Sequence, residues 1–254
     1  MTVGADGNFY GQASGGTYGW GIVFKMTPEG ALTTFVSLNS DNGPSDFSRL
    51  VQSSDGNFYC VSQAGGPYGA GSVFKVSPTG VQTTIVSFTN LNAIAFGGLI
   101  EAADGNFYGP RSGGGAFNRG IIYRVTTEGV LTTMVSFNST NGWWPRAALI
   151  QGRDGNFYGT TELGGAYDLG TAFCLHVPFS DSPKIRTATK SGTKMVLTWG
   201  ALPGCTYEVQ FKTNFNQTLW SDLGNSISAT NTLATSCDSN ASDSQRFYRI
   251  VLLR

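Results

Sequence analysis

Few side chains of this sequence are suited to catalysis, and most of them are carboxylates. The single histidine, His176, excludes sites that combine several histidine ligands or bases. The sequence contains no Gly-x-Ser-x-Gly motif, no Cys-x-x-Cys pair and no phosphate-binding Gly-x-x-x-x-Gly-Lys loop. Glu101, Glu162 and Asp168 are therefore the candidate catalytic residues, because carboxylates can supply the acid and base of glycoside, ester or lactone hydrolysis.

Aromatic rings and arginines form a second group, which has binding chemistry. Trp and Tyr rings present large rigid surfaces that stack on sugars or anchor a protein interface, and arginine supplies hydrogen-bond donors beside them. The candidate ligand-binding residues are Trp143, Trp144, Arg146, Trp20, Phe96, Arg119 and Phe47. This set favours a surface that binds a glycan, a small molecule or a protein.

An internal repeat must position these residues. The sequence Asp-Gly-Asn-Phe-Tyr begins at Asp6, Asp55, Asp104 and Asp154, at spacings of 49, 49 and 50 residues. Each full copy has a short strand before the Asp-Gly turn, then a glycine-rich loop between two strands, a second turn and a β-branched strand. Four antiparallel strands in about 50 residues are typical of a β-propeller blade, and a solenoid is the less favoured alternative. We expect blades near residues 1–40, 45–89, 94–138 and 143–177.

The repeat resembles a known family. Residues 149–161, Leu-Ile-Gln-Gly-Arg-Asp-Gly-Asn-Phe-Tyr-Gly-Thr-Thr, and the Gly-Gly that follows resemble the GloVer (Gloeo/Verruco) tandem repeats of bacterial surface proteins. The resemblance covers residues 1 to about 177 and implies a propeller-like extracellular protein. It implies no established activity and no catalytic residues.

A second domain is expected after the repeats. Glycine becomes rare beyond a linker at residues 178–183, and short strands follow one another through residues 184–254. This pattern predicts a small fibronectin-like β-sandwich, and it resembles the C-terminal sandwich domains of verrucomicrobial surface proteins. The predicted fold is all-β, with a β-propeller of about four four-stranded blades over residues 1–177 and a β-sandwich over residues 184–254.

The four cysteines fall into two pairs. Cys205 and Cys237 lie at expected neighbouring strand ends of the sandwich, where a disulfide and two free thiols are both compatible with the sequence. Cys60 and Cys174 interrupt positions of the repeat, and we expect both to be buried free thiols.

Propeller connectivity sorts the candidate residues onto two faces. The Asp-Gly-Asn turns form one face, and since each offers a single carboxylate we interpret them as turns rather than calcium loops. The glycine-rich loops and the crossings between blades form the other face, where function tends to lie. We expect the repeated loop residues Tyr18, Tyr68 and Tyr167 to fill gaps between blades, whereas the pair at Trp143 and Trp144 has no counterpart in the other repeats.

A calcium site is the one cofactor hypothesis. Glu101 lies on an inner strand of the repeat, where other copies have Gln52 and Gln151. Carboxylate and amide oxygens are ligands that Ca²⁺ accepts, and calcium-dependent propeller hydrolases such as lactonases offer a fold-level analogy. These three residues are therefore the candidate metal ligands of a central channel.

Composition limits the class of protein. Lys and Arg number 16, as do Asp and Glu, and charged residues make up 13% of the chain, which excludes nucleic-acid binding by bulk positive charge. No apolar run approaches the roughly 18 residues of a membrane span. The first residues lack the basic and apolar segments of a signal peptide, so we expect the sequence to begin after an export signal or inside a longer array. Abundant Gly, Ser, Thr and Asn suit an extracellular or cell-surface location.

Three functions are compatible with these observations. The favoured one is an extracellular binding or surface protein that recognises a glycan or a protein through its aromatic loop face. The alternative is a calcium-dependent propeller hydrolase of lactones, esters or glycosides. The third is a structural repeat piece that assembles into a larger ring, because the first and fourth repeats are incomplete and a homodimer would complete the propeller.

Overall fold

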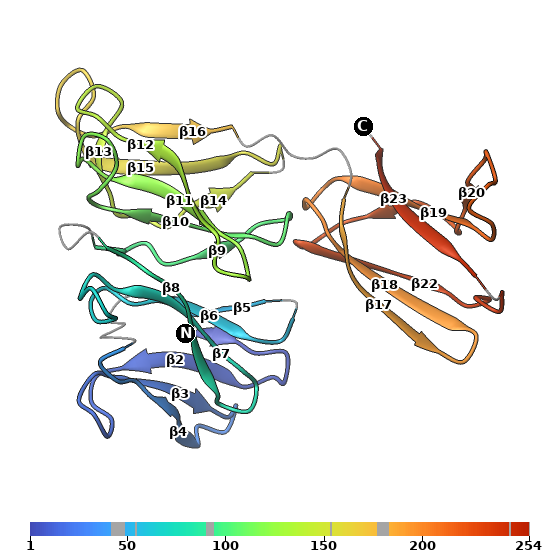
Figure 1. Cartoon of the computed structure of the whole chain (residues 1–254), viewed down its shortest axis with the longest axis horizontal. Helices are drawn as coiled ribbons and strands as arrows, with labels where there is room; N and C mark the ends of the chain where they lie inside the picture. Colours follow the sequence, from blue (N-terminus) through green and yellow to red (C-terminus); the bar gives the residue numbers. More distant parts are fainter. Residues whose placement is uncertain are drawn as a thin grey trace. The chain divides into compact units, whose positions relative to one another are not determined.

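Every regular element that the structure describes is a β-strand, as predicted. The computed structural model describes residues 1–41, 49–53, 55–89, 94–152, 154–176, 183–243 and 245–253, and Figure 1 shows the chain. It divides into two compact units. Unit 1 comprises Met1–Glu101, Asn106–Ile150 and Phe157–Leu175, and unit 2 comprises Ala102–Gly105, Gln151–Asn156 and His176–Arg254.

Each of the first three repeats forms one four-stranded antiparallel sheet whose strands pair in chain order. Sheet I contains β1 (Thr2–Val3), β2 (Phe9–Ala13), β3 (Ile22–Met26) and β4 (Leu32–Ser37). Sheet II contains β5 (Val51–Gln52), β6 (Phe58–Val61), β7 (Ser72–Val76) and β8 (Gln82–Ser87). Sheet III contains β9 (Ile100–Glu101), β10 (Phe107–Arg111), β11 (Ile121–Val125) and β12 (Leu131–Ser136).

Sheet IV, from the fourth repeat, has a different fourth strand. It contains β13 (Trp143–Pro145), β14 (Ile150–Gln151), β15 (Phe157–Leu163) and β16 (Ala172–Leu175). The first three of these are ordered β13-β15-β14, and β16 pairs with β15. β13 pairs with the second half of β15, because Trp143 lies opposite Leu163 and Pro145 opposite Thr161. Residues 177–182, which include most of the predicted linker, lie outside the described residues.

The repeated Asp-Gly-Asn-Phe-Tyr motif builds the turn between the first two strands. In sheet II, Asp55 Oδ1 accepts the backbone N–H of Asn57 at 2.9 Å, and its Oδ2 accepts the Asn57 amide at 2.8 Å and the Tyr59 hydroxyl at 2.7 Å. Sheet I repeats these bonds around Asp6, where Lys25 also donates at 2.9 Å. The glycine between Asp and Asn adopts a φ of +83° in sheet II, which a tight hairpin turn needs. The motif therefore recurs because it closes a turn.

Neighbouring sheets of unit 1 pack through one repeated contact. Adjacent residues of a strand point to opposite faces, so each sheet has a tyrosine face, marked by Tyr10, Tyr59, Tyr108 or Tyr158, and a phenylalanine face, marked by Phe9, Phe58, Phe107 or Phe157. The tyrosine face of sheet I packs on the phenylalanine face of sheet II, and so on through sheet IV. The three ring pairs have centroid distances of 4.2, 4.1 and 4.4 Å.

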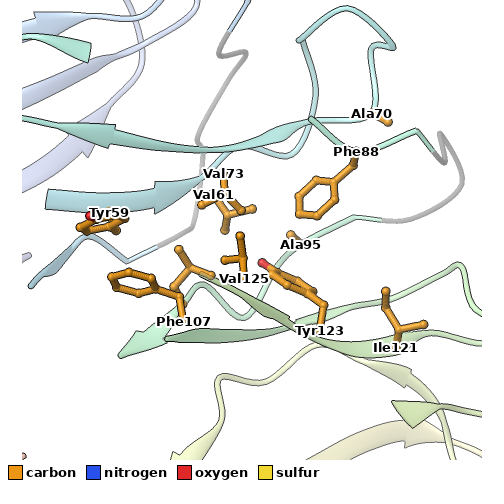
Figure 2. Packing of buried hydrophobic residues seen from close by; sticks show 11 residues of the cluster. Tyr59, Val61, Ala70, Val73, Phe88, Ala95, Phe107, Ile121, Tyr123 and Val125 are labelled. Carbon is orange, nitrogen blue, oxygen red and sulfur yellow. The ribbon is translucent and has the colours of Figure 1, made fainter. Parts of the chain in front are cut away.

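The contact between sheets II and III shows what this packing buries. Figure 2 shows Val61 and Val73 of sheet II facing Tyr123 and Val125 of sheet III, with Phe88 beside them. All of these side chains are buried. Burying a large apolar side chain contributes about 1.5–3 kcal/mol, so these contacts between sheets hold unit 1 together. In Figure 1, sheets I and IV lie at opposite ends of unit 1.

Unit 2 contains two antiparallel sheets around one core. The first contains β17 (Ile185–Ser191), β18 (Lys194–Gly200) and β22 (Leu233–Asp238), and the second contains β19 (Thr206–Lys212), β20 (Ser221–Asp222), β21 (Ile227–Ser228) and β23 (Phe247–Leu253). Trp199 from the first sheet and Tyr207 from the second are fully buried in the shared core. This arrangement agrees with a sandwich; the expected fibronectin-like topology and domain boundaries stay predictions.

The disulfide that the sequence allows in unit 2 is not formed, because the two thiols lie on different sides of their sheets. Cys205 packs against the apolar core, whereas Cys237 is exposed on β22, between the inward-facing Ser236 and Asp238. None of the four cysteines forms a disulfide. Cys60 is buried as expected, but Cys174 is exposed, because it lies on the tyrosine face of sheet IV.

The turn carboxylates predict how the stability of unit 1 depends on pH. Hydrogen bonds to Asp55 from Asn57 and Tyr59 outweigh its partial burial and lower its pKa below the usual value. A lowered folded-state pKa adds stability above the unfolded pKa of about 3.9, and this stability is lost as the pH falls through the folded value. We expect the urea midpoint to fall less between about pH 5 and about pH 3 in Asp55→Asn than in the wild type. Equal falls would contradict this role.

Candidate functional site

Each repeat presents an exposed aromatic ring at the same position of its glycine-rich loop, which is the β2–β3, β6–β7, β10–β11 or β15–β16 loop. These loop rings are 62%, 56%, 59% and 87% exposed, and they belong to Tyr18, Tyr68, Phe117 and Tyr167. The expectation that Tyr18, Tyr68 and Tyr167 fill gaps between sheets is wrong. The gaps are filled instead by strand residues such as Val61 and Val125, which leaves the loop rings in solvent.

A second aromatic group lies on the side of unit 1 that carries these loops, where β13 adjoins the β15–β16 loop (Figure 1). The Trp143 and Trp144 rings are 4.8 Å apart. The Arg119 guanidinium lies 3.8 Å over the Trp143 ring, and the Arg146 guanidinium lies 4.8 Å from the Trp144 ring and 5.1 Å from that of Phe96. The structure thus brings five of the predicted ligand-binding residues into one stack, which we call the arginine–tryptophan ladder.

The backbone at Trp144 adopts an unusual conformation. Its φ is +57°, a left-handed value that costs a bulky residue about 1–2 kcal/mol. The Trp144 N–H donates to the carbonyl of Arg119 at 3.0 Å, which ties β13 to the β10–β11 loop. Strain of this kind persists where surrounding contacts over-determine the conformation, and it clusters at functional sites. The sequence places this pair in a crossing loop, whereas the structure places it on a short strand.

Glu162 and Asp168, two predicted catalytic residues, hold this region together. The Glu162 carboxylate pairs with Arg146 at 3.0 Å, with about half of each side chain exposed. Asp168 Oδ1 accepts the backbone N–H of Gly164 at 2.8 Å within the β15–β16 loop, as Asn118 Oδ1 accepts that of Gly114 at 3.0 Å in the β10–β11 loop. Asp168 and Asn118 have φ values of +55° and +51°. Since an asparagine takes the same place, the observed role of Asp168 is to cap a loop.

The three candidate calcium ligands join the turns of neighbouring repeats. Gln52 Oε1 accepts the backbone N–H of Ala5 at 2.7 Å, and Gln151 Oε1 accepts that of Ala103 at 3.2 Å. Glu101 Oε1 accepts the hydroxyl of Ser53 at 2.8 Å. The bonded residues are 47 or 48 positions apart in the sequence. In the second, third and fourth repeats, therefore, one polar residue links the inner strand to the turn of the preceding repeat.

Metal ligands do not gather in the part of the chain that the structure describes: no three His, Cys, Asp or Glu side chains lie together there. His176 follows Leu175, which pairs with Phe157 at the start of β15. This end of sheet IV lies away from the β15–β16 loop. The calcium site and the catalytic roles of Glu101, Glu162 and Asp168 stay predictions.

Two predicted ligand-binding residues are not among those that form the ladder. Trp20 belongs to the β2–β3 loop of sheet I, which lies at the opposite end of the stack of sheets from sheet IV (Figure 1), and its side chain is 38% exposed. Phe47 lies outside the described residues. The glycine-rich loop of the third repeat places Phe117 on the same loop face as the three tyrosines, but none of these four rings was among the predicted ligand-binding residues. The recurrence of an aromatic residue in every glycine-rich loop was a usable signal.

A buried arginine nearby has a structural role. Arg111 is 4% exposed, donates to the carbonyl of Ala70 at 3.0 Å, and stacks 4.0 Å over the Phe88 ring. Burial lowers its pKa to about 10. Since Ala70 and Phe88 come from the second repeat, this side chain joins sheet III to the loop end of the preceding repeat.

Comparison with known families identifies the repeat. The model of the Gloeobacter/Verrucomicrobia repeat matches residues 1–100 and, overlapping them, residues 90–208. No curated protein matches the chain in sequence. In the described part of the chain, no helix is long and apolar enough to cross a membrane.

Solved structures resemble the chain at low sequence identity. A glycoside hydrolase aligns over 100% of this chain and 80% of its own, at 12% identity and a TM-score of 0.39. A puromycin hydrolase aligns over 79% and 33%, at 13% identity and a TM-score of 0.41. The extracellular domain of a two-component-system protein from B. thetaiotaomicron aligns over 100% and 36%, at 13% identity and a TM-score of 0.44. The chain spans about a third of the latter two.

Proposed function

Because the chain belongs to the Gloeobacter/Verrucomicrobia repeat family, we propose that its four stacked sheets are propeller blades whose loop end binds an extended glycan outside the cell. The observation that carries this proposal is the exposed aromatic ring at the same loop position of every repeat. Packed sheets lie about 10 Å apart, so the loop rings recur at a spacing that suits successive segments of a polysaccharide.

The chemistry of the loop rings supports a sugar rather than a charged ligand. Aromatic faces stack on the apolar faces of sugar rings, and Tyr adds a hydroxyl that bonds to sugar hydroxyl groups. The chain has zero net charge, and the exposed cation of the ladder, Arg146, is already paired with Glu162. A neutral polysaccharide is therefore the ligand class we propose.

In this proposal the arginine–tryptophan ladder orients two arginine side chains toward the glycan. Both tryptophan rings are half-buried and covered by their stacked neighbours, so their faces are largely used within the protein. A guanidinium stacked face-on keeps its N–H groups free to donate in its own plane. In this proposal the ladder holds Arg119 and Arg146 beside the rings of Phe117 and Tyr167, where they donate to sugar hydroxyls.

The experiment is affinity electrophoresis and titration calorimetry against a panel of neutral and acidic polysaccharides. Tyr68→Ala and Tyr167→Ala should each weaken binding about three- to tenfold, since an aromatic contact contributes about 0.5–1.5 kcal/mol. Leu169→Ala removes an 85% exposed neighbour in the same loop, and Phe215→Ala removes a 77% exposed ring of unit 2. Both controls should bind as the wild type does.

A second variant tests the ladder without unfolding it. Asn tolerates a left-handed backbone, so Trp144→Asn should keep the fold while it releases Arg146, and binding should weaken by a similar factor. Binding should be unchanged by EDTA, because no calcium ligand takes part in the proposed contact. The proposal is overturned if no polysaccharide binds, or if loss of the loop rings leaves binding unchanged. Loss of binding in EDTA would favour the calcium-dependent alternative.

A further inference from the structure

The two ends of unit 1 expose the same faces that the interior of the unit buries. Tyr10, Tyr59 and Tyr108 are 4%, 0% and 1% exposed because the next sheet covers them. Tyr158, the fourth member of the series, is 41% exposed. The tyrosine face of sheet IV therefore lies open at one end of the stack.

This open tyrosine face is apolar around Tyr158. Ile150, which corresponds to Val51 and Ile100 in register, is 68% exposed. Ala172 and Cys174 are also exposed. By contrast, the residues that correspond to Ala172 in sheets I, II and III are fully buried; they are Val23, Val73 and Ile122.

The phenylalanine face of sheet I lies open at the other end. Phe58, Phe107 and Phe157 are 2%, 0% and 0% exposed, whereas Phe9 is only half-buried. Its neighbours on this face are apolar as well: Phe24 and Met26 are half-buried, Met1 is 74% exposed, Val3 62% and Leu32 61%. Exposed apolar residues gathered on one face mark an interaction surface.

We propose that a second copy of this chain covers both open faces. The tyrosine face of sheet IV in one copy packs on the phenylalanine face of sheet I in its partner, with a Tyr158–Phe9 ring contact like the three at 4.1–4.4 Å inside each chain. A twofold axis brings both pairs of faces together. The resulting ring has eight sheets, within the usual range of four to eight propeller blades.

The complementarity of the faces favours this occupant. Faces of these two kinds pack on one another three times within the chain, which supports the same pairing between two copies. The end contact differs from the internal ones in two ways. Ala172 replaces the larger Val23, Val73 and Ile122 of the internal tyrosine faces. Val3 stands where Gln52, Glu101 and Gln151 link neighbouring turns. The contact between copies therefore lacks that hydrogen bond and depends on apolar burial.

The test is the mass in solution by sedimentation and light scattering over a range of concentrations. The wild type should have twice the chain mass of 26.9 kDa. Tyr158→Arg and Phe9→Arg should each give the mass of one chain, because a head-to-tail contact uses both faces. Val3→Arg changes a 62% exposed side chain on the phenylalanine face, so it should not disturb folding, and it should also give the mass of one chain. Phe215→Arg, on a 77% exposed ring of unit 2, should keep the double mass.

A thiol probe gives an independent readout. Cys174 lies on the open tyrosine face and is exposed in the single chain. In a Cys237→Ser background, it should be protected from a maleimide reagent in the wild-type contact and react in Tyr158→Arg. A single-chain mass at every concentration overturns the proposal. So does a mass that grows beyond two chains, or dissociation by only one of the two end variants. Glycan binding is measured separately, so either proposal can fail alone.

Discussion

Tyr108→Ala is expected to lower the free energy of unfolding by about 3–5 kcal/mol, as is typical when a buried aromatic ring is removed from a core. The Tyr108 ring is 1% exposed and packs on Phe157 with a centroid distance of 4.4 Å. Its removal leaves a cavity between sheets III and IV, which neighbouring sheets can fill only by moving together.

The matched control is the same substitution one repeat later. Tyr158 occupies the same position in sheet IV but is 41% exposed, so Tyr158→Ala should cost about 1 kcal/mol or less. Urea unfolding followed by tryptophan fluorescence measures both, in protein dilute enough that copies do not associate. Equal losses would show that the tyrosine face of sheet IV is covered within the chain, and would also remove the basis for pairing of two copies.

Gly71→Ala is expected to destabilise the protein by about 3 kcal/mol or more, since it combines a strained backbone with a steric clash. Gly71 has a φ of +85°, and a Cβ atom there would lie 2.2 Å from the carbonyl oxygen of Ser62. That carbonyl belongs to the backbone and cannot rotate away. Gly71 ends the loop that presents Tyr68, so the fraction of the Gly71→Ala variant that does fold should also bind glycan less tightly than the wild type.

Gly7→Ala separates the two causes. Gly7 has a similar φ of +79°, but a Cβ atom there would meet nothing within 4 Å. Only the cost of a left-handed alanine, about 1–2 kcal/mol, should remain. Thermal unfolding of the two variants measures the difference. A Gly71→Ala protein as stable as Gly7→Ala would mean that the β6–β7 loop can relax at little cost.

Much of the fold follows from local signals in the chain. The Asp-Gly turns, the β-branched runs and the period of the repeat predict antiparallel strands because each depends on residues close in sequence. The same signals cannot reveal which face of a strand meets the next repeat. That choice depends on packing between residues of different repeats, such as the contact of Tyr59 with Phe107.

The candidate site was predictable in composition and not in arrangement. The unusual pair Trp143 and Trp144 is visible in the chain, as are Arg119 and Arg146. Their stacking in one ladder is not, because β13 joins the edge of β15 and the β10–β11 loop only in the folded protein. The prediction that Tyr18, Tyr68 and Tyr167 fill gaps failed for the same reason: burial is a property of the neighbours.

By itself, the sequence determined that this protein is built from repeated antiparallel β units with tight Asp-Gly turns, because short-range backbone preferences and side-chain hydrogen bonds decide those features. Only the tertiary structure decided which of four equivalent residues are buried. Tyr108 and Tyr158 stand in the same local motif, yet one lies inside the stack and the other at its end. Position in the stack is set by how many sheets lie on either side, and no local pattern encodes that number.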